Sequence, residues 1–138
     1  MSASFEYEIT LSVSLSELDR LQTWVEGHLP SPDCPEKVRS QIAIVTEEVF
    51  VNLIRYAYGG KPGTAVIRLS LRDREAVLQF EDAGAGFNPL EYPIPDINAD
   101  ITKRTVGGLG IHLTKTLSDE VVYSRTAGRN LLTVYKRW

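Results

Sequence analysis

Two polar side chains interrupt an otherwise apolar helical pattern between Glu47 and Gly60. Glu48 and Asn52 are four residues apart, so both side chains leave the same face of a helix. Asn52 falls at the edge of the apolar stripe, where an amide buried without a partner would cost on the order of 1–3 kcal/mol. A ligand on that face would satisfy both groups. The alternative is a solvated or intrahelical pair.

A second group of candidate residues follows a strand pattern in the stretch EDAGAGFNP. Asp82 ends the strand, and Gly84 and Gly86 follow it with one residue between them. Such glycines let the backbone approach a ligand closely or adopt positive φ. A buried carboxylate at a strand end can accept a hydrogen bond from an exocyclic amine, such as that of adenine. The alternative is a plain Asx turn.

The third group is the glycine-rich stretch GGLGIHLTKTL, with Gly107, Gly108 and Gly110. We expect these glycines to precede a helix, whose free N–H groups and positive dipole end would form an anion site. The alternative is a flexible hinge. Neither glycine group matches the P-loop or the dinucleotide-binding fingerprint.

The periodicity of the chain predicts the elements that must position these three groups. They are a strand over residues 5–13, a helix that starts at Ser14 with a Ser14–Glu17 capping box, a helix from about Pro35 to Tyr58, a hairpin of strands 64–71 and 76–82, a helix from about Leu109 to Leu117, and strands 120–126 and 130–137. This order predicts a two-layer α+β sandwich, with helices on one face of a mostly antiparallel mixed sheet. The irregular stretch before the third helix is typical of a lid or binding loop, which we expect over about 88–105.

Composition narrows the class of protein. The chain has 138 residues, which fits one domain, and a net charge of −3, which argues against a dedicated nucleic-acid binder. Cys34 is the only cysteine, so an intrachain disulfide is excluded. The N-terminus has no basic residue before Arg20 and alternates polar with apolar side chains, unlike a signal peptide or a membrane span. A cytoplasmic location is the default expectation.

In sequence order the three groups resemble the GHKL ATPase superfamily of gyrase, chaperone, histidine-kinase and mismatch-repair ATPases. The small size, the N-terminal strand and the ending SDEVVYSRTAGRNLLTVYKRW resemble its anti-sigma-factor serine/threonine kinases. The resemblance covers nearly the whole chain. It implies the Bergerat (GHKL ATPase) fold and a single histidine kinase-like ATPase domain over residues 1–138.

The resemblance also implies roles for individual residues, with ATP and Mg²⁺ as cofactors. Glu48 would be the catalytic base, which accepts the proton of the attacking hydroxyl. Asn52 would be the metal ligand, coordinating Mg²⁺ that bridges the ATP phosphates. Asp82 would hydrogen-bond the adenine amine. The remaining nucleotide-binding residues would be Gly84, Gly86, Lys103, Arg104, Gly108, Leu109 and Gly110.

One motif departs from the family pattern. Family kinases often have an arginine directly before the glycine pair, whereas this chain reads RTVGGLG. Arg104 lies one or two positions further out, and Lys103 precedes it. Either side chain could reach the phosphates from the lid, and the alternative is a solvated lid residue.

By resemblance, the function would be that of an ATP-dependent serine/threonine protein kinase that phosphorylates an anti-sigma-factor antagonist of the STAS type and regulates a sigma factor. The sigma factor would be a competing partner, and a homodimer is compatible with this assignment. No direct nucleic-acid or membrane partner is expected. The alternative is a nucleotide-dependent protein-binding module that switches partners without phosphotransfer. The chain lacks a phospho-acceptor histidine motif with dimerisation helices, so we do not expect a complete sensor histidine kinase.

Overall fold

A single antiparallel sheet organises the molecule. The computed structural model describes residues 5–30, 32–91 and 106–138. The sheet has 5 strands in the order β1-β2-β3-β5-β4, and each of its pairings is antiparallel, so the expected mixed character is absent among the described strands. The strands are β1 (Tyr7–Ser12), β2 (Thr64–Arg72), β3 (Glu75–Asp82), β4 (Glu120–Thr126) and β5 (Arg129–Arg137).

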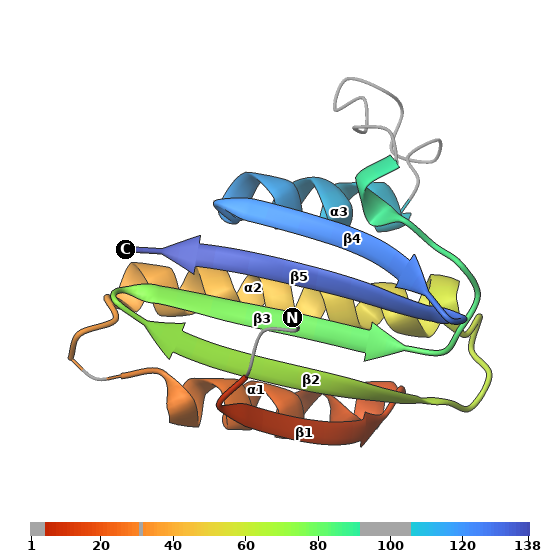
Figure 1. The fold of residues 1–138 in the computed structure, drawn as a ribbon, viewed down its shortest axis with the longest axis horizontal. Coiled ribbons are helices and arrows are strands. Elements are labelled where there is room, and N and C mark those ends of the chain that lie inside the picture. Colours follow the sequence, from red (N-terminus) through yellow and green to blue (C-terminus); the bar gives the residue numbers. More distant parts are fainter. Residues whose placement is uncertain (1–4, 31, 92–105) are drawn as a thin grey trace.

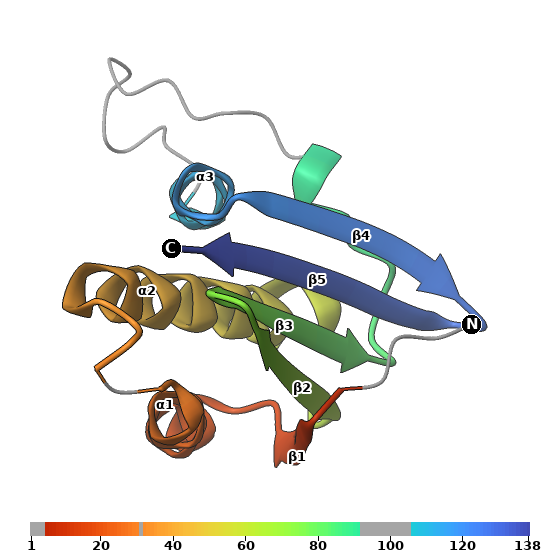
Figure 2. The ribbon, with the colours of Figure 1, turned by 60° about the vertical axis from the view of Figure 1, so that its left-hand side comes forward.

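The helices cover one face of this sheet, as Figures 1 and 2 show. They are α1 (Leu18–His28), α2 (Glu36–Asn52) and α3 (Val106–Leu117), with the short turns η1 (Leu15–Glu17), η2 (Leu53–Ala57) and η3 (Pro89–Glu91). The predicted two-layer α+β sandwich and its element order are therefore confirmed. No helix in the described residues is long and apolar enough to cross a membrane.

Alternation along the strands builds the core and also fixes the inward direction of one carboxylate. In β3, Ala76, Leu78 and Phe80 are buried against the helices, and the same alternation carries Asp82 into the interior. Burying a side chain such as Phe80 contributes about 1.5–3 kcal/mol, so several of them in one layer hold this strand firmly. The helices supply the facing core residues Leu21, Val25, Val38, Ile42, Val45, Val49 and Phe50.

The start of the first helical segment differs from the prediction. Ser14 does precede it, but its side chain caps no backbone N–H group, because its Oγ lies 2.8 Å from Ser16 Oγ. Glu17 instead accepts a hydrogen bond from Arg20 at 3.0 Å. The first turn is a 3₁₀ helix, whose tighter winding replaces the α-helical geometry that a capping box needs. The predicted Ser14–Glu17 capping box is therefore wrong.

The third helix begins earlier than predicted. It starts at Val106, so Gly107, Gly108 and Gly110 lie inside α3 and do not precede it. Glycine is a weak helix former, which is why the sequence pattern places the start later. Only the first four N–H groups of a helix lack an intrahelical partner. Gly108 is within that set, whereas Gly110 is the fifth residue of α3.

The predicted lid lies mostly outside the described residues. Residues 92–105 are not described, and they include Lys103 and Arg104. The predicted phosphate contact of either side chain therefore stays a prediction. The described part before it includes η3, where the backbone N–H of Leu90 donates to Asn88 Oδ1 at 2.9 Å.

Candidate functional site

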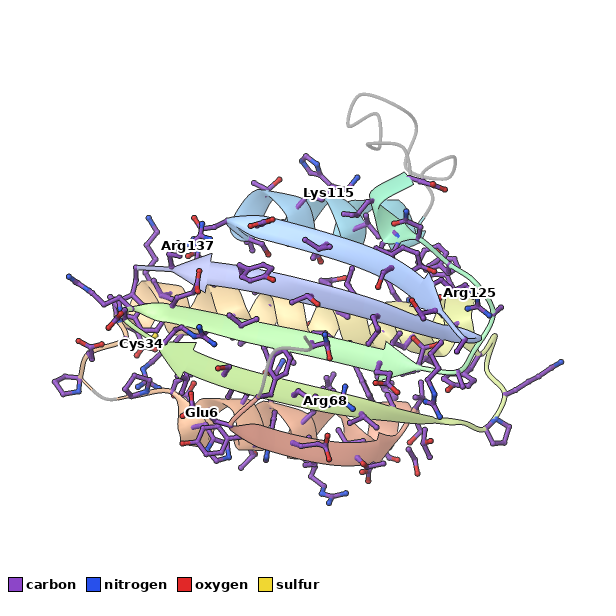
Figure 3. The ribbon with its side chains drawn as sticks, viewed as in Figure 1. Glu6, Cys34, Arg68, Lys115, Arg125 and Arg137 are labelled. Atoms are coloured by element: carbon purple, nitrogen blue, oxygen red, sulfur yellow. The ribbon has the colours of Figure 1, made fainter. Side chains whose placement is uncertain are left out.

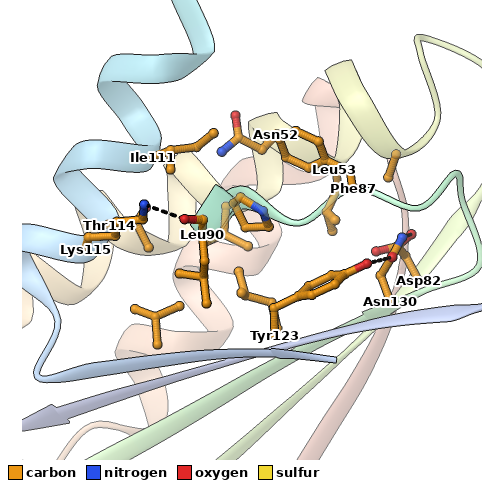
Figure 4. Close-up of a pocket in the computed structure, with 15 residues that line it drawn as sticks. Asn52, Leu53, Asp82, Phe87, Leu90, Ile111, Thr114, Lys115, Tyr123 and Asn130 are labelled. Carbon is orange, nitrogen blue, oxygen red and sulfur yellow. Dashed lines mark hydrogen bonds between the residues drawn. The ribbon is translucent and has the colours of Figure 1, made fainter. Parts of the chain in front are cut away.

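A pocket opens between the helical layer and the sheet, with an empty volume of about 480 Å³. Its walls come from α2, η2, η3, α3 and the three strands β3, β4 and β5, as Figure 4 shows. Most of the lining is apolar, with a few polar groups among it, which is typical of a small-molecule site. The lining includes Val49, Asn52, Leu53, Asp82, Ile111, Thr114, Tyr123, Asn130 and Leu132.

Asp82 supplies an unpaired acceptor at one end of the pocket. Its side chain is 1% exposed. Oδ1 accepts hydrogen bonds from the Gly84 backbone N–H at 2.9 Å and from Asn130 Nδ2 at 3.0 Å. Oδ2 is buried and receives no hydrogen bond from the described residues. Because buried polar atoms are nearly always hydrogen-bonded, this oxygen is available to a donor from outside the described residues, such as a ligand N–H group.

A π-helical turn at the end of α2 contacts the loop that follows Asp82 and holds it in place. In η2 the Tyr58 N–H donates to Leu53 O at 3.0 Å, five residues back, so the predicted end of this helix near Tyr58 is reached through a wider turn. The Ala57 carbonyl accepts the Ala85 N–H at 2.7 Å. A Cβ at Gly84 would overlap that carbonyl oxygen. Gly84 therefore permits the close approach of the loop to the helix end.

Tyr58 ties the same loop to the sheet. Its hydroxyl donates to Thr64 O at 2.7 Å and accepts the Ala83 N–H at 3.1 Å. The start of β2, the end of β3 and the end of the π turn therefore meet at one side chain. Gly86 lies further along the loop, where a Cβ would be 3.3 Å from Arg125 Cδ, a contact that a flexible side chain can relieve.

Asn52 lies in the helical wall of the pocket, whereas Glu48, one turn before it on α2, is not among the lining residues. Asn52 is 7% exposed and lines the pocket near Ile111 of α3. Glu48 is half-buried, and a Cβ at Gly110 would overlap its Oε2, so the carboxylate rests against the backbone of α3. The absence of a side chain at Gly110 leaves the space that this carboxylate fills.

The protonation of Glu48 follows from its surroundings. Burial raises the pKa of the Glu48 carboxyl above its ordinary value, and the neighbouring Glu47 carboxylate raises it further, whereas Arg55 lowers it. Within the described residues nothing donates a hydrogen bond to this carboxylate. A carboxylate with a raised pKa and free lone pairs is suited to accept a proton.

The structure thus brings most of the predicted site residues together. Asn52 and Asp82 line one pocket, Gly84 and Gly86 form the loop beside it, and Glu48 lies against Gly110 of α3. Of the other predicted residues, Gly108 and Leu109 lie in the first turn of α3.

The comparisons with known proteins place the chain in a family. A model of the family described as "Histidine kinase-like ATPase domain" matches residues 11–136. The chain belongs to this family. A solved structure of the Acinetobacter baumannii histidine kinase AdeS is also similar, with 16% identity and a TM-score of 0.49, over 94% of this chain and 67% of that chain. No curated protein sequence matches significantly.

Members of the histidine kinase-like ATPase family are ATP-dependent kinases and ATPases, and this chain is an ATP-binding domain of that kind. The pocket fits the nucleotide on its own chemistry. The unpaired Oδ2 of Asp82 suits an exocyclic amine, and the apolar walls at Val49 and Ile111 suit a flat base. An amide oxygen such as that of Asn52 is a hard ligand of the type Mg²⁺ prefers.

Several pocket residues are not predicted by the sequence patterns. Asn130 and Tyr123 contact the Asp82 end, and Lys115 Nζ donates to Leu90 O at 3.0 Å, which ties α3 to η3. A signal for Asn130 was present in its strand. It shares the alternation of Leu132 and Val134, so a polar residue stands at an inward position.

Proposed function

We propose that this chain is an ATP-dependent serine/threonine protein kinase of the anti-sigma-factor type. Its substrate is an anti-sigma-factor antagonist of the STAS type, and its activity regulates a sigma factor that competes for the same kinase. The three motifs in their order, the small size and the C-terminal sequence support this subfamily, and the family match supports ATP-dependent chemistry.

The observation that carries the kinase activity is the position of Glu48. It lies one helical turn before Asn52, is half-buried against Gly110, and keeps its carboxylate free of hydrogen bonds from the described residues. Burial raises the pKa of its carboxyl, and a raised pKa makes the carboxylate a stronger proton acceptor. A half-buried carboxylate with a purely structural role would instead accept hydrogen bonds or form an ion pair.

Each residue contributes one function to the transfer. Asp82 Oδ2 would accept a hydrogen bond from the adenine amine and fix the base. The Asn52 amide oxygen would hold Mg²⁺, which when bound would neutralise charge on the phosphates. Glu48 accepts the proton of the substrate hydroxyl while the hydroxyl oxygen bonds the γ-phosphorus and ADP leaves. The N–H groups in the first turn of α3, including that of Gly108, would bind the anionic phosphates.

The test compares two substitutions that separate chemistry from binding. Glu48→Gln keeps the size of the side chain but removes the charge, so phosphotransfer should fall by roughly 10²–10⁴-fold while ATP affinity persists. Asn52→Ala removes a metal ligand and should weaken Mg-ATP binding itself. Glu47→Gln, an exposed neighbour on the same helix, is the matched control and should retain transfer.

The measured quantity is the transfer of labelled phosphate from ATP to a STAS-type antagonist from the same cell. A pull-down with and without ATP identifies that partner. Equal labelling by wild type and Glu48→Gln would remove Glu48 from the role of base. No labelling by wild type with the partner present would favour a binding module, whose partner affinity depends on the bound nucleotide.

A further inference from the structure

The side chain of Asn130 is held by hydrogen bonds on every side. It is 4% exposed at the start of β5. Nδ2 donates to Asp82 Oδ1 at 3.0 Å and to Ala85 O at 2.8 Å. Oδ1 accepts from the Tyr123 hydroxyl at 2.5 Å and from Arg125 Nη1 at 2.9 Å. Two acceptors face the nitrogen and two donors face the oxygen, so only one orientation of the amide satisfies all four partners.

This amide fixes the carboxylate of Asp82 in turn. Asn130 and Asp82 are opposite each other in the β3–β5 ladder, so the strand register brings them together. Asn130 and the Gly84 N–H both donate to Oδ1. Rotation of the carboxylate would break these two bonds, and the second oxygen, Oδ2, is therefore held toward the pocket without a partner.

Tyr123 and Arg125 hold Asn130 from the neighbouring strand. Figure 4 shows the hydrogen bonds from Tyr123 through Asn130 to Asp82 along one wall of the pocket. Arg125 Nη1 also donates to Gly84 O at 3.2 Å, so one guanidinium contacts both the amide and the glycine loop. Figure 3 shows Arg125 at the end of the sheet where β4 and β5 are joined. The network thus spans three adjacent strands.

We propose that Asn130 is a specificity-determining positioning residue for the base, oriented by Tyr123 and Arg125. It saturates Asp82 Oδ1 so that Oδ2 alone meets the ligand, and Oδ2 can only accept a hydrogen bond. The ligands selected are purine nucleotides with an amine at position 6, and those with a carbonyl or hydrogen there are rejected. This inference rests on the proposed ATP-dependent function and adds the residue that sets its base preference.

The experiment compares ATP with purine riboside triphosphate, which lacks only the 6-amine, by calorimetry. Wild type should prefer ATP by at least about tenfold, because the analogue leaves a buried carboxylate oxygen unpaired. In Asn130→Ala the ratio of the two affinities should fall toward one, with the loss confined to ATP. GTP serves as a third ligand, which wild type should bind more weakly than ATP.

A second variant keeps the shape of the side chain. Asn130→Asp places a carboxylate oxygen against Asp82 Oδ1 and Ala85 O, so the donor becomes a repelling acceptor. The preference for ATP should be lost here as well, although the packing volume is unchanged. Thermal unfolding shows whether each variant is folded. Thr133→Ala is the matched control, since Thr133 lies on the same strand and accepts a hydrogen bond from Gln79 of β3 at 3.3 Å.

The outcomes are distinguishable. A folded Asn130 variant that keeps the wild-type ratio of ATP to analogue overturns the inference and leaves the proposed kinase intact. Equal weakening of both nucleotides also overturns it, since that pattern indicates a merely structural role. Folded wild type that binds no ATP overturns the proposed function, and the inference with it. Loss of the ratio in both Asn130 variants, and not in Thr133→Ala, supports the inference.

Discussion

Two parts of the candidate site, the buried end of the pocket at Asp82 and the carboxylate of Glu48 on α2, are built in opposite ways. At the base end, Asp82 and Asn130 are buried and hydrogen-bonded, and one oxygen alone is left for a ligand. Between α2 and α3, Glu48 is half-buried against Gly110 and receives no hydrogen bond from the described residues. The difference separates two tasks. Recognition needs a fixed acceptor, whereas a proton acceptor must be free to change its partner.

The supporting elements explain this difference. Asp82 and Asn130 sit on β3 and β5, whose paired backbones fix the distance between the two side chains. Glu48 and Gly110 lie on two helices, where only side-chain packing sets the separation. A Cβ at Gly84 would collide with backbone, but a Cβ at Gly110 would collide with the end of a side chain. Two alanine substitutions can therefore test the comparison.

The largest effect is expected from Gly84→Ala. The new Cβ overlaps the Ala57 carbonyl, which cannot move without unseating the loop and its Ala85 hydrogen bond. Overpacking of this kind costs about 1–3 kcal/mol of folding free energy. Displacement of the loop should also weaken ATP binding and phosphotransfer by more than about 10²-fold, as misplaced groups do. Chemical denaturation and calorimetry measure the two effects.

Gly86→Ala is the control for that substitution. Its Cβ would be 3.3 Å from Arg125 Cδ, and a flexible exposed side chain can shift by that amount. Stability should stay near wild type, and ATP affinity should fall much less than in Gly84→Ala, because the Arg125 side chain and not the backbone must shift. If Gly86→Ala lost as much stability and ATP affinity as Gly84→Ala, the whole loop would be intolerant of side chains, and the contact of Gly84 with Ala57 would not be the cause.

A smaller and more selective effect is expected from Gly110→Ala. The Cβ displaces the Glu48 carboxylate and leaves the base end untouched. Phosphotransfer should fall by about ten- to 10²-fold, while ATP affinity changes little. Stability should not fall, because alanine favours a helix interior over glycine by about 1 kcal/mol. A parallel loss of ATP affinity would contradict the separation of Glu48 from the base-binding end of the pocket.

The smallest effect is a shift in the pH dependence of phosphotransfer. Glu48 acts as a base in its ionised form, so activity is lost as the pH falls through its pKa. Arg55 lowers that pKa, so Arg55→Gln should move the acid limb of the profile to higher pH. Glu47 raises it, and Glu47→Gln should move the limb to lower pH. Both groups are exposed and screened by salt, so the shifts should shrink at high ionic strength.

Much of the fold could be predicted from local patterns. The alternation in β2 and β3 and the short connection at 73–74 specify a hairpin, and the structure confirms it. The stripe of Val38, Ile42, Val45 and Val49 specifies one long helix against the core. These patterns repeat over several helical turns or strand residue pairs, so many residues independently indicate the same secondary structure.

The sequence did not predict those features whose geometry depends on only a few residues. The apolar stripe continues through Leu53 and Ala57, so nothing in it distinguishes a π turn from an α turn. Glycine at 107, 108 and 110 gives no helical signal, although α3 forms through packing on α2. Asn130 could be assigned an inward direction from its strand, but its pairing with Asp82 requires the register between β3 and β5.

The π turn has a consequence for how the length of this chain can vary. A π turn accommodates one residue more than an α turn over nearly the same rotation and rise. One residue removed from Leu53–Ala57 would therefore leave an ordinary α turn with the chain after it in nearly the same place. The Ala57 carbonyl and the Tyr58 ring would keep their positions beside Ala85, Thr64 and Ala83. We therefore expect a single deletion to be accepted between Asn52 and Tyr58, and changes of length to be accepted at the exposed Gly59–Lys61 turn.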